Sequence, residues 1–376
     1  MRSRRSIITR LAVVMSLVAP GMVVAACGSD DNGAATSTGS NANAGVVSQA
    51  KVDVSKYLEP VRQLDIAPLA QAAPKGVRLT LISCPSCTAQ DKGVTAAAKA
   101  LGWQLKIVTP KMTPESYVSA WTSVVQAKPD AIIGVSPFPL DAMKRQLDAA
   151  KQAGITVVTQ GASTYPVGGD SAVVADGSGA NVFTVQGELY ADVPIADAGK
   201  APNAVLVVDG AIPAWKVISG AFQKRITAAG AKFRQLDVSL ASAGKDAPSQ
   251  IVSYLQRSPD VDYVVLVVPA YYIGLKQALK SAGLDKVKIV IGAADSTIAP
   301  LLENGDVLAG VGLETLSGAW RLVDAVARKL TDSDMSCCTH IGSSYLVVQK
   351  SNAALAAGLS DYPNRYQDFR AAWKVE

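Results

Sequence analysis

Four of the five cysteines in this 376-residue sequence form two close pairs. Cys84 and Cys87 are separated by two residues, whereas Cys337 and Cys338 are adjacent and are followed by His340, the only histidine. These spacings permit structural disulfides, a thioredoxin-type redox pair at Cys84 and Cys87, or a zinc site. We expect disulfides and no metal, because adjacent cysteines are not a usual ligand spacing. The connectivity stays open, because four cysteines allow three pairings.

The first 26 residues are typical of an export signal. Four arginines lie within the first ten residues, and an almost wholly apolar run follows from 11 to 26. The run is shorter than the ~20 apolar residues that a membrane-spanning helix needs. We therefore predict a signal peptide over 1–26 and an exported mature chain. Arg4 and Arg5 also fit a twin-arginine signal, so the export route stays open.

The fifth cysteine, Cys27, directly follows the small residues Val24, Ala25 and Ala26. This ending resembles a bacterial lipobox, which implies cleavage before Cys27 and a diacylglycerol group on its sulfur. We expect 27–75 to be a lipid-anchored tether and lead-in. Residues 28–50 are small and polar, so they are predicted to be a flexible linker.

Polar and aromatic side chains stand just after several predicted strands, where open α/β sheets bind ligands. Such pockets combine an apolar wall with a few polar groups that orient the ligand. The alternative for each side chain is packing within its own half of the protein. For Trp215 in particular, the alternative is to seal the start of its own helix. The residues predicted to contact a ligand are Pro85, Ser86, Phe138, Gln160, Trp215, Tyr271, Asp295 and Glu314.

Composition and motifs argue against catalysis and against nucleic-acid binding. The net charge of +5 arises largely in the signal: four of the 36 basic residues precede Cys27, which leaves 32 basic against 31 acidic residues. The sequence has no basic stripe, GxSxG, P-loop or paired-carboxylate motif. We expect no enzyme activity, no catalytic residues, no cofactor and no nucleic-acid partner.

The body of the chain alternates short β-branched runs with amphipathic helical stretches. This order predicts βαβ units and parallel sheets covered on both faces by helices. Two successive βα series of similar size predict two lobes. Strands are expected at 77–82, 104–108, 131–135, 155–159, 204–208, 232–238, 263–268, 288–291 and 307–313. Helices are expected at 92–101, 114–127, 140–153, 181–196, 218–229, 249–257, 272–282, 297–303 and 318–330.

The order of these segments resembles the ribose-type periplasmic binding proteins of type I. Five segments over roughly 76–350 carry the resemblance: 92–103, 128–133, 150–158, 281–283 and 304–311. It implies an α/β fold with two similar three-layer, Rossmann-like lobes joined by a three-strand hinge. The implied lobes are 76–175 with 313–340, and 178–311 with 341–376. The implied crossovers lie near 174–178, 310–314 and 340–345.

The resemblance implies a solute-binding lipoprotein that captures a small molecule between its lobes and delivers it to the permease and ATPase of an ABC importer. The protein is expected to be a monomer anchored on the outer face of the cytoplasmic membrane. Sugar binders of this class usually have an Asp directly after a Gly-aromatic pair, but here Gly292 is followed by two alanines and Asp295 comes one residue late. A simple aldose is therefore less favoured than a less polar, modified or aromatic ligand.

Two other functions stay open at this point. The same fold could present its ligand to a membrane sensor. Cys84 and Cys87 alone would also suit an extracytoplasmic thiol oxidoreductase.

Overall fold

The computed structural model describes residues 37–60, 65–85, 87–161, 165–177, 180–358 and 365–375. All of these residues except Ser37 belong to one compact unit, Thr38–Glu376. The predicted signal peptide and the lipidation residue Cys27 lie outside the described residues. Within these ranges, no helix has the length and apolar character needed to cross a membrane.

The first sheet has five parallel strands in the order β2-β1-β3-β4-β5. Its side chains alternate between two cores: Leu79 and Leu81 of β1 join one, whereas Ile82 and Ile132 join the other. Apolar side chains on both faces are what a helix-covered parallel sheet requires. The strands are β1 Arg78–Ile82, β2 Gln104–Val108, β3 Ala131–Val135, β4 Thr156–Gln160 and β5 Ala175–Asp176.

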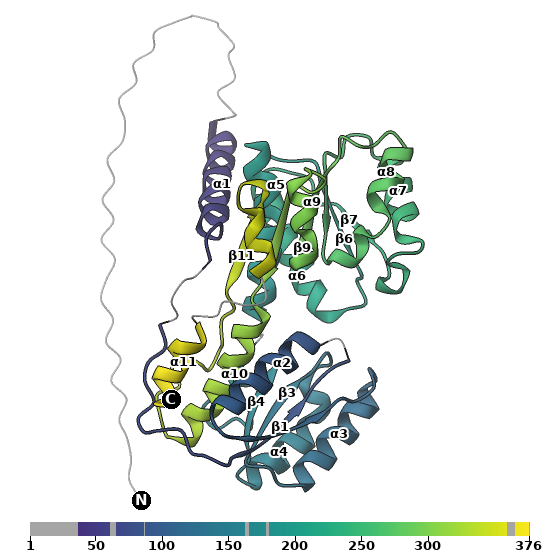
Figure 1. Cartoon of the computed structure of the whole chain (residues 1–376). Helices are drawn as coiled ribbons and strands as arrows, with labels where there is room; N and C mark the ends of the chain where they lie inside the picture. The colour runs from purple at the N-terminus through teal and green to yellow at the C-terminus, as the bar shows by residue number, and fades with distance from the viewer. Residues whose placement is uncertain are drawn as a thin grey trace, which may run out of the picture. The chain divides into compact units, whose positions relative to one another are not determined.

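Helices cover both faces of this sheet, and together they form what we call the first lobe (Figure 1). One face is covered by α2 Thr88–Ala100, α10 Thr315–Leu330 and α11 Arg365–Trp373. The other is covered by α3 Pro114–Gln126, the 3-10 turn η1 Leu140–Met143 and α4 Lys144–Gln152.

The second lobe is built around a six-stranded sheet in the order β11-β10-β9-β8-β6-β7, in which only β11 is antiparallel to its neighbour. Its strands are β6 Ala204–Val208, β7 Gln235–Asp237, β8 Tyr263–Leu266, β9 Lys288–Ala294, β10 Ala309–Leu313 and β11 Tyr345–Gln349. Its helices are α1 Ser37–Lys56, α5 Ala180–Ala198, α6 Pro213–Ala228, α7 Ala247–Arg257, α8 Leu275–Ser281 and α9 Ala299–Glu303. Short 3-10 segments are η2 Leu240–Ser242, η3 Pro269–Tyr272, η4 Ser296–Ile298 and η5 Lys350–Gly358. The predicted two-lobed α/β fold is confirmed.

The chain passes between the lobes three times in its middle part. Two of these connections lie side by side: the Asp176 N–H donates to the Thr339 carbonyl at 3.0 Å, and the Ile341 N–H donates to the Asp176 carbonyl at 2.8 Å. The three connections run between Asp176 and Ala180, between Leu313 and Thr315, and between Leu330 and Tyr345.

The N-terminal segment that was predicted to be a flexible linker contains helix α1, so that prediction was wrong from residue 37 onward. The spacing of Val47, Ala50 and Val54 forms an apolar stripe along one helical face. Ala50 and Val54 are buried in the core of the second lobe. The small, polar composition of the segment concealed this stripe.

The C-terminal tail also departs from the predicted assignment to the second lobe. Helix α11 packs on α10 of the first lobe (Figure 1). Its Trp373 ring stacks on Trp320 with centroids 5.2 Å apart and planes at 4°. Tyr366, Phe369 and Trp373 follow helical spacing, so the tail had an apolar face that needed a partner.

Candidate ligand site

A cavity of about 240 Å³ lies at the carboxyl ends of β1, β3 and β4. This is the edge at which open α/β sheets bind ligands. Both lobes contribute to its wall. The first lobe provides Cys84, Cys87, Gln90, Val135, Ser136, Pro137, Gln160 and Gly161, and the second lobe provides Phe183, Ile212 and Ala214.

The Cys84–Cys87 disulfide forms part of the cavity wall. The turn that closes it is held by the Cys87 N–H, which donates to the Cys84 carbonyl at 3.0 Å. Cys87 is also the N-cap residue of α2. The bridge therefore joins the end of β1 to the start of the next helix, and both of its residues line the cavity.

Two glutamines of the cavity wall each carry a buried polar atom that has no hydrogen-bond partner among the described residues. Gln90 lies in the first turn of α2 and is only 5% exposed, yet its Nε2 has no acceptor there. Gln160 ends β4, and its buried Oε1 has no donor there. A buried polar group without a partner costs about 1–3 kcal/mol. Both atoms are enclosed by protein, so the wall holds two unsatisfied polar groups beside the cavity.

The loops after β3 and β4 come close together beside these glutamines. A side chain at Gly161 would collide with the backbone oxygen of Ser136, so only glycine fits there. The Ser136 hydroxyl is already engaged, because it donates to the Phe138 carbonyl at 2.8 Å and accepts from the Phe138 N–H at 3.3 Å. Ser136 therefore shapes the wall and offers little further hydrogen bonding.

Of the residues predicted to bind ligand, Gln160 lies on the cavity wall. Pro85 is exposed beside the disulfide, and Ser86 lies outside the described residues. Phe138 follows the wall residue Pro137, but its ring packs on Tyr117 with centroids 5.3 Å apart. Phe138 thus supports the wall from behind.

The predicted stacking role of Tyr271 does not agree with its position. Its side chain is fully buried in the core of the second lobe, and its hydroxyl donates to the Val238 carbonyl at 2.6 Å. Burial raises the pKa of this phenol above its usual range. Trp215 is half-buried, and its ring makes an edge contact with Tyr271 at 6.4 Å. Both rings pack in the second lobe and are not part of the cavity wall.

The two predicted acidic residues are engaged in local structure. The Asp295 carboxylate is exposed and accepts from the Thr297 N–H at 2.9 Å, which caps the turn η4. Glu314 is 3% exposed and accepts from the Ser317 hydroxyl at 2.9 Å, next to a crossover between the lobes. Neither residue lines the cavity. The side chain of each accepts a hydrogen bond from the first turn of the helical segment that follows it.

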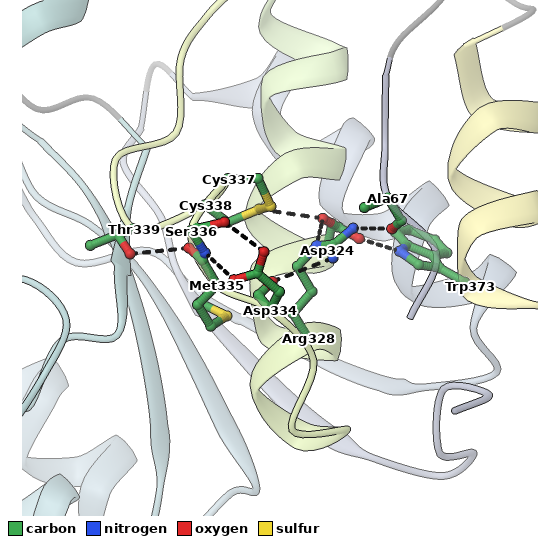
Figure 2. Close-up of a disulfide and its surroundings, with 10 residues drawn as sticks. All are labelled: Ala67, Asp324, Arg328, Asp334, Met335, Ser336, Cys337, Cys338, Thr339 and Trp373. Atoms are coloured by element: carbon green, nitrogen blue, oxygen red, sulfur yellow. Dashed lines mark hydrogen bonds and ion pairs between the residues drawn. A yellow bond between two sulfur atoms is a disulfide. The ribbon is translucent and has the colours of Figure 1, made fainter. Parts of the chain in front are cut away.

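The second cysteine pair lies away from the cavity, in the loop between α10 and β11. Figure 2 shows the Cys337–Cys338 disulfide beside a buried network on α10. Asp324 accepts from Arg328 Nε at 2.7 Å and from Trp373 Nε1 at 2.7 Å. Burial raises the pKa of this carboxyl above its usual value. The network fastens α11 to α10 and has no opening to the ligand cavity among the described residues.

Both cysteine pairs are thus joined locally, as Cys84–Cys87 and Cys337–Cys338. No group of three or more His, Cys, Asp or Glu side chains suited to a metal occurs in the ranges that the structure describes.

Sequence reasoning missed Gln90 and Phe183 as wall residues. A signal for Gln90 was present: a long polar side chain occurs in the first turn of an Ala-rich helix that follows a strand end. That position places it at the ligand-binding edge of the sheet. Phe183 gave no such signal, because its approach to the cavity depends on how α5 packs in the second lobe.

Comparison with known proteins agrees with the fold. A family model described as a periplasmic binding protein domain matches residues 85–333. No curated protein matches the sequence.

Solved structures share the fold at low sequence identity. An ABC transporter solute-binding protein from Agrobacterium vitis, bound with alpha-D-tagatopyranose, is 21% identical with a TM-score of 0.63, over 76% of this chain and 99% of that chain. A periplasmic ribose ABC transporter protein from Conexibacter woesei is 15% identical with a TM-score of 0.63, over 76% and 96%. A sugar ABC transport substrate-binding protein from Bordetella parapertussis is 18% identical with a TM-score of 0.62, over 83% and 98%.

Proposed function

This chain belongs to the periplasmic binding protein family, and we propose that it captures a small molecule between its lobes and delivers it to an importer. Members of the family are non-enzymatic solute-binding proteins of ABC transporters. The proposed partner is therefore the permease and ATPase of such a transporter. The observation that carries the proposal is the cavity at the strand ends, lined by residues of both lobes. Residues of both lobes line it, so a bound molecule would touch both and favour the state in which they are close.

In this proposal the protein works as a monomer outside the cytoplasm, which is where its family acts. A lipid on Cys27 would hold it at the outer face of the membrane, near the importer. The basic and apolar residues before Cys27 support this anchoring. Oxidising conditions outside the cell also suit the Cys84–Cys87 and Cys337–Cys338 disulfides.

One of the similar solved structures contains a bound sugar and another is named for ribose. We therefore propose that the ligand is a sugar-like or less polar small molecule. The wall differs from a polyol site, because its side chains are mainly apolar.

Capture can be tested on full-length protein purified under native conditions from the bacterium that produces it. We expect native mass spectrometry to detect a retained small molecule that is lost on denaturation. The Gln160→Leu variant should retain much less of it, whereas Gln104→Leu, on the exposed side of β2, should retain as much as the wild type. The proposal fails if the protein retains no molecule and binds none from fractionated extracts of its own cells and medium.

A further inference from the structure

A disulfide between adjacent cysteines lies within one of the connections between the lobes. Cys337 and Cys338 are joined in the loop between α10 and β11, so the bond closes a small ring that contains the peptide bond between them. The Met335 carbonyl closes the same turn, because it accepts from the Cys338 N–H at 2.9 Å and from the Thr339 N–H at 3.0 Å. The ring therefore restricts the backbone of the residues that lead into Thr339.

This turn leads directly into the place where two connections between the lobes pair with each other. The Thr339 carbonyl accepts from the Asp176 N–H at 3.0 Å, and the Ile341 N–H donates to the Asp176 carbonyl at 2.8 Å. Asp176 and His340 form a parallel bridge between these two bonds. Cys338 and Thr339 are neighbours in the chain, so backbone freedom gained in the ring passes directly to this pairing.

The two disulfides of the described chain differ in their exposure to solvent. Cys337 is an exposed residue, and its partner Cys338 is 8% exposed. In the other disulfide, Cys84 is also 8% exposed and Cys87 is half-buried. Thiol–disulfide exchange requires access for the attacking thiolate. Cys337 is therefore the residue at which we expect an external thiol to attack first.

An acceptor for the reduced form is already in place. Cys338 Sγ lies 3.8 Å from Asp324 Oδ2, as Figure 2 shows. In the disulfide this sulfur has no hydrogen to donate, but as a thiol it is a weak donor to that carboxylate. Asp324 is held in position by Arg328 and Trp373. The open state of the cysteine pair therefore has a stabilising contact that the closed state lacks.

We propose that Cys337–Cys338 is a thiol-exchange site that sets the mobility of the hinge. The closed ring stabilises the pairing with Asp176, and reduction by a dithiol outside the cytoplasm loosens it. One thiolate of the dithiol attacks Cys337, the S–S bond breaks, and the Cys338 sulfur leaves. The second thiolate then attacks the mixed disulfide and releases Cys337. The dithiol becomes a disulfide, and its two thiol protons end on Cys337 and Cys338.

The consequence for ligand capture rests on the proposed function. A hinge that is already ordered loses less conformational freedom when the lobes close on a bound molecule. Oxidised protein should therefore retain its molecule better than protein reduced at Cys337 and Cys338.

The test uses full-length protein and graded concentrations of dithiothreitol, a small dithiol. Alkylation followed by peptide mass spectrometry should find Cys337 and Cys338 modified while Cys84–Cys87 is still closed. Under these conditions hydrogen exchange should become about tenfold faster in the peptides that contain the Asp176 and Ile341 amides, because freeing the backbone of one residue is worth about that factor. Reoxidation should restore the slow exchange.

Two double variants separate the effect of the ring from other effects of the reductant. Cys337→Ser with Cys338→Ser should show the fast exchange without dithiothreitol and should not respond to it. Cys84→Ser with Cys87→Ser should keep the slow exchange at the hinge and should respond to dithiothreitol as the wild type does. In wild-type protein, native mass spectrometry should show a smaller retained fraction of bound molecule after selective reduction.

The proposal is overturned if Cys84–Cys87 opens first, or if reduction of Cys337–Cys338 leaves hydrogen exchange at the hinge unchanged. Faster exchange with an unchanged retained fraction would contradict the effect on capture. Protein that retains no molecule in either state would contradict the proposed function. The exchange measurement needs no ligand, so it decides on the thiol-exchange site separately.

Discussion

Trp215 stands in the first turn of α6, beside the wall residues Ile212 and Ala214, but its ring points to the core of the second lobe. It packs against Tyr271 and against the buried cluster around the second sheet. The Trp215 N–H donates to the Ile212 carbonyl at 3.0 Å, which helps to start the helix. Of the two roles that the sequence allowed, these contacts favour sealing the helix start over stacking on ligand.

We therefore expect Trp215→Ala to lower the free energy of unfolding by about 2 kcal/mol, less than for a fully buried aromatic residue because the ring is half-exposed. Ligand affinity should change by less than about threefold, which corresponds to well under 1 kcal/mol. Chemical denaturation and calorimetry measure the two effects on the same protein. If the variant keeps its stability but loses much of its affinity for the ligand, Trp215 contacts the ligand and the expectation is wrong.

Cys27 carries the proposed anchor, and its substitution has a simple expected outcome. Cys27→Ser should release the protein into the medium, because a single residue would carry the acyl chains that hold it at the membrane. Cell fractionation and the intact mass of the mature protein measure this.

Cys337→Ser is a suitable control for Cys27→Ser, because it also removes a cysteine but lies in the folded body, and it should stay with the membrane fraction. A Cys27→Ser protein that remains membrane-bound with unchanged mass would contradict the anchor.

At the scale of elements, one arginine ties three helices of the second lobe together. Arg225 of α6 contacts Asp192 of α5 at 2.5 Å and Asp53 of α1 at 2.8 Å. Asp192 is 1% exposed, and burial raises its pKa to about 6 although Arg225 opposes the shift. Asp53 is more exposed, so its contact is a weaker one. The ion pair between Arg225 and Asp192 is therefore the one whose loss should matter.

Arg225→Met should destabilise the protein by about 3 kcal/mol at pH 7, because it leaves a buried carboxylate unpaired. In the unfolded chain the Asp pKa is about 3.9, whereas the folded pKa of Asp192 is higher. The stability linked to protonating Asp192 is thus fully present below about pH 4 and is lost as the pH rises through about 6. The penalty in the variant should accordingly be smaller at pH 5 than at pH 7.

Urea denaturation at the two pH values measures this difference. Asp53→Asn provides the matched control, and it should cost less than about 1 kcal/mol at both pH values. An equal penalty for Arg225→Met at pH 5 and pH 7 would contradict a charged, unpaired Asp192 as its cause.

At the scale of the whole molecule, the ends of the described chain add connections between the lobes beyond the three in its middle. Helix α1 packs in the second lobe, yet Leu69, farther along the lead-in, packs in the first lobe and its N–H donates to the Ala372 carbonyl at 2.9 Å. Helix α11 likewise follows second-lobe elements and packs in the first lobe. Motion of the lobes therefore has to be compatible with these connections.

We still expect the lobes to close on ligand, because the cavity wall comes from both of them. Small-angle scattering should show a smaller radius of gyration after the molecule retained by the native protein is added back to stripped protein. Gln160→Leu should need a higher concentration for the same change. No change in the wild type at saturating ligand would rule out closure as the mechanism.

Much of the fold was predictable from local sequence. The alternation of β-branched runs with helical stretches predicted β1 to β4 and most helices, because burial on both faces of a parallel sheet demands such runs. The resemblance over roughly 76–350 added the two-lobed arrangement. Gln160 was predictable as a wall residue, since it directly follows the predicted strand 155–159, and the C-x-x-C spacing allowed the Cys84–Cys87 bridge.

The tertiary structure decided which of the candidate side chains meet. Phe138, Trp215 and Tyr271 all follow strand ends, but their rings turn into cores, because packing around Tyr117 and Val238 offers more buried contact. Whether a polar atom is left without a partner, as in Gln90, depends on every neighbour in space and is invisible in the chain order. The sequence by itself therefore determined the lobes and their order, and only the packed structure decided the cavity wall and the positions of both ends of the described chain.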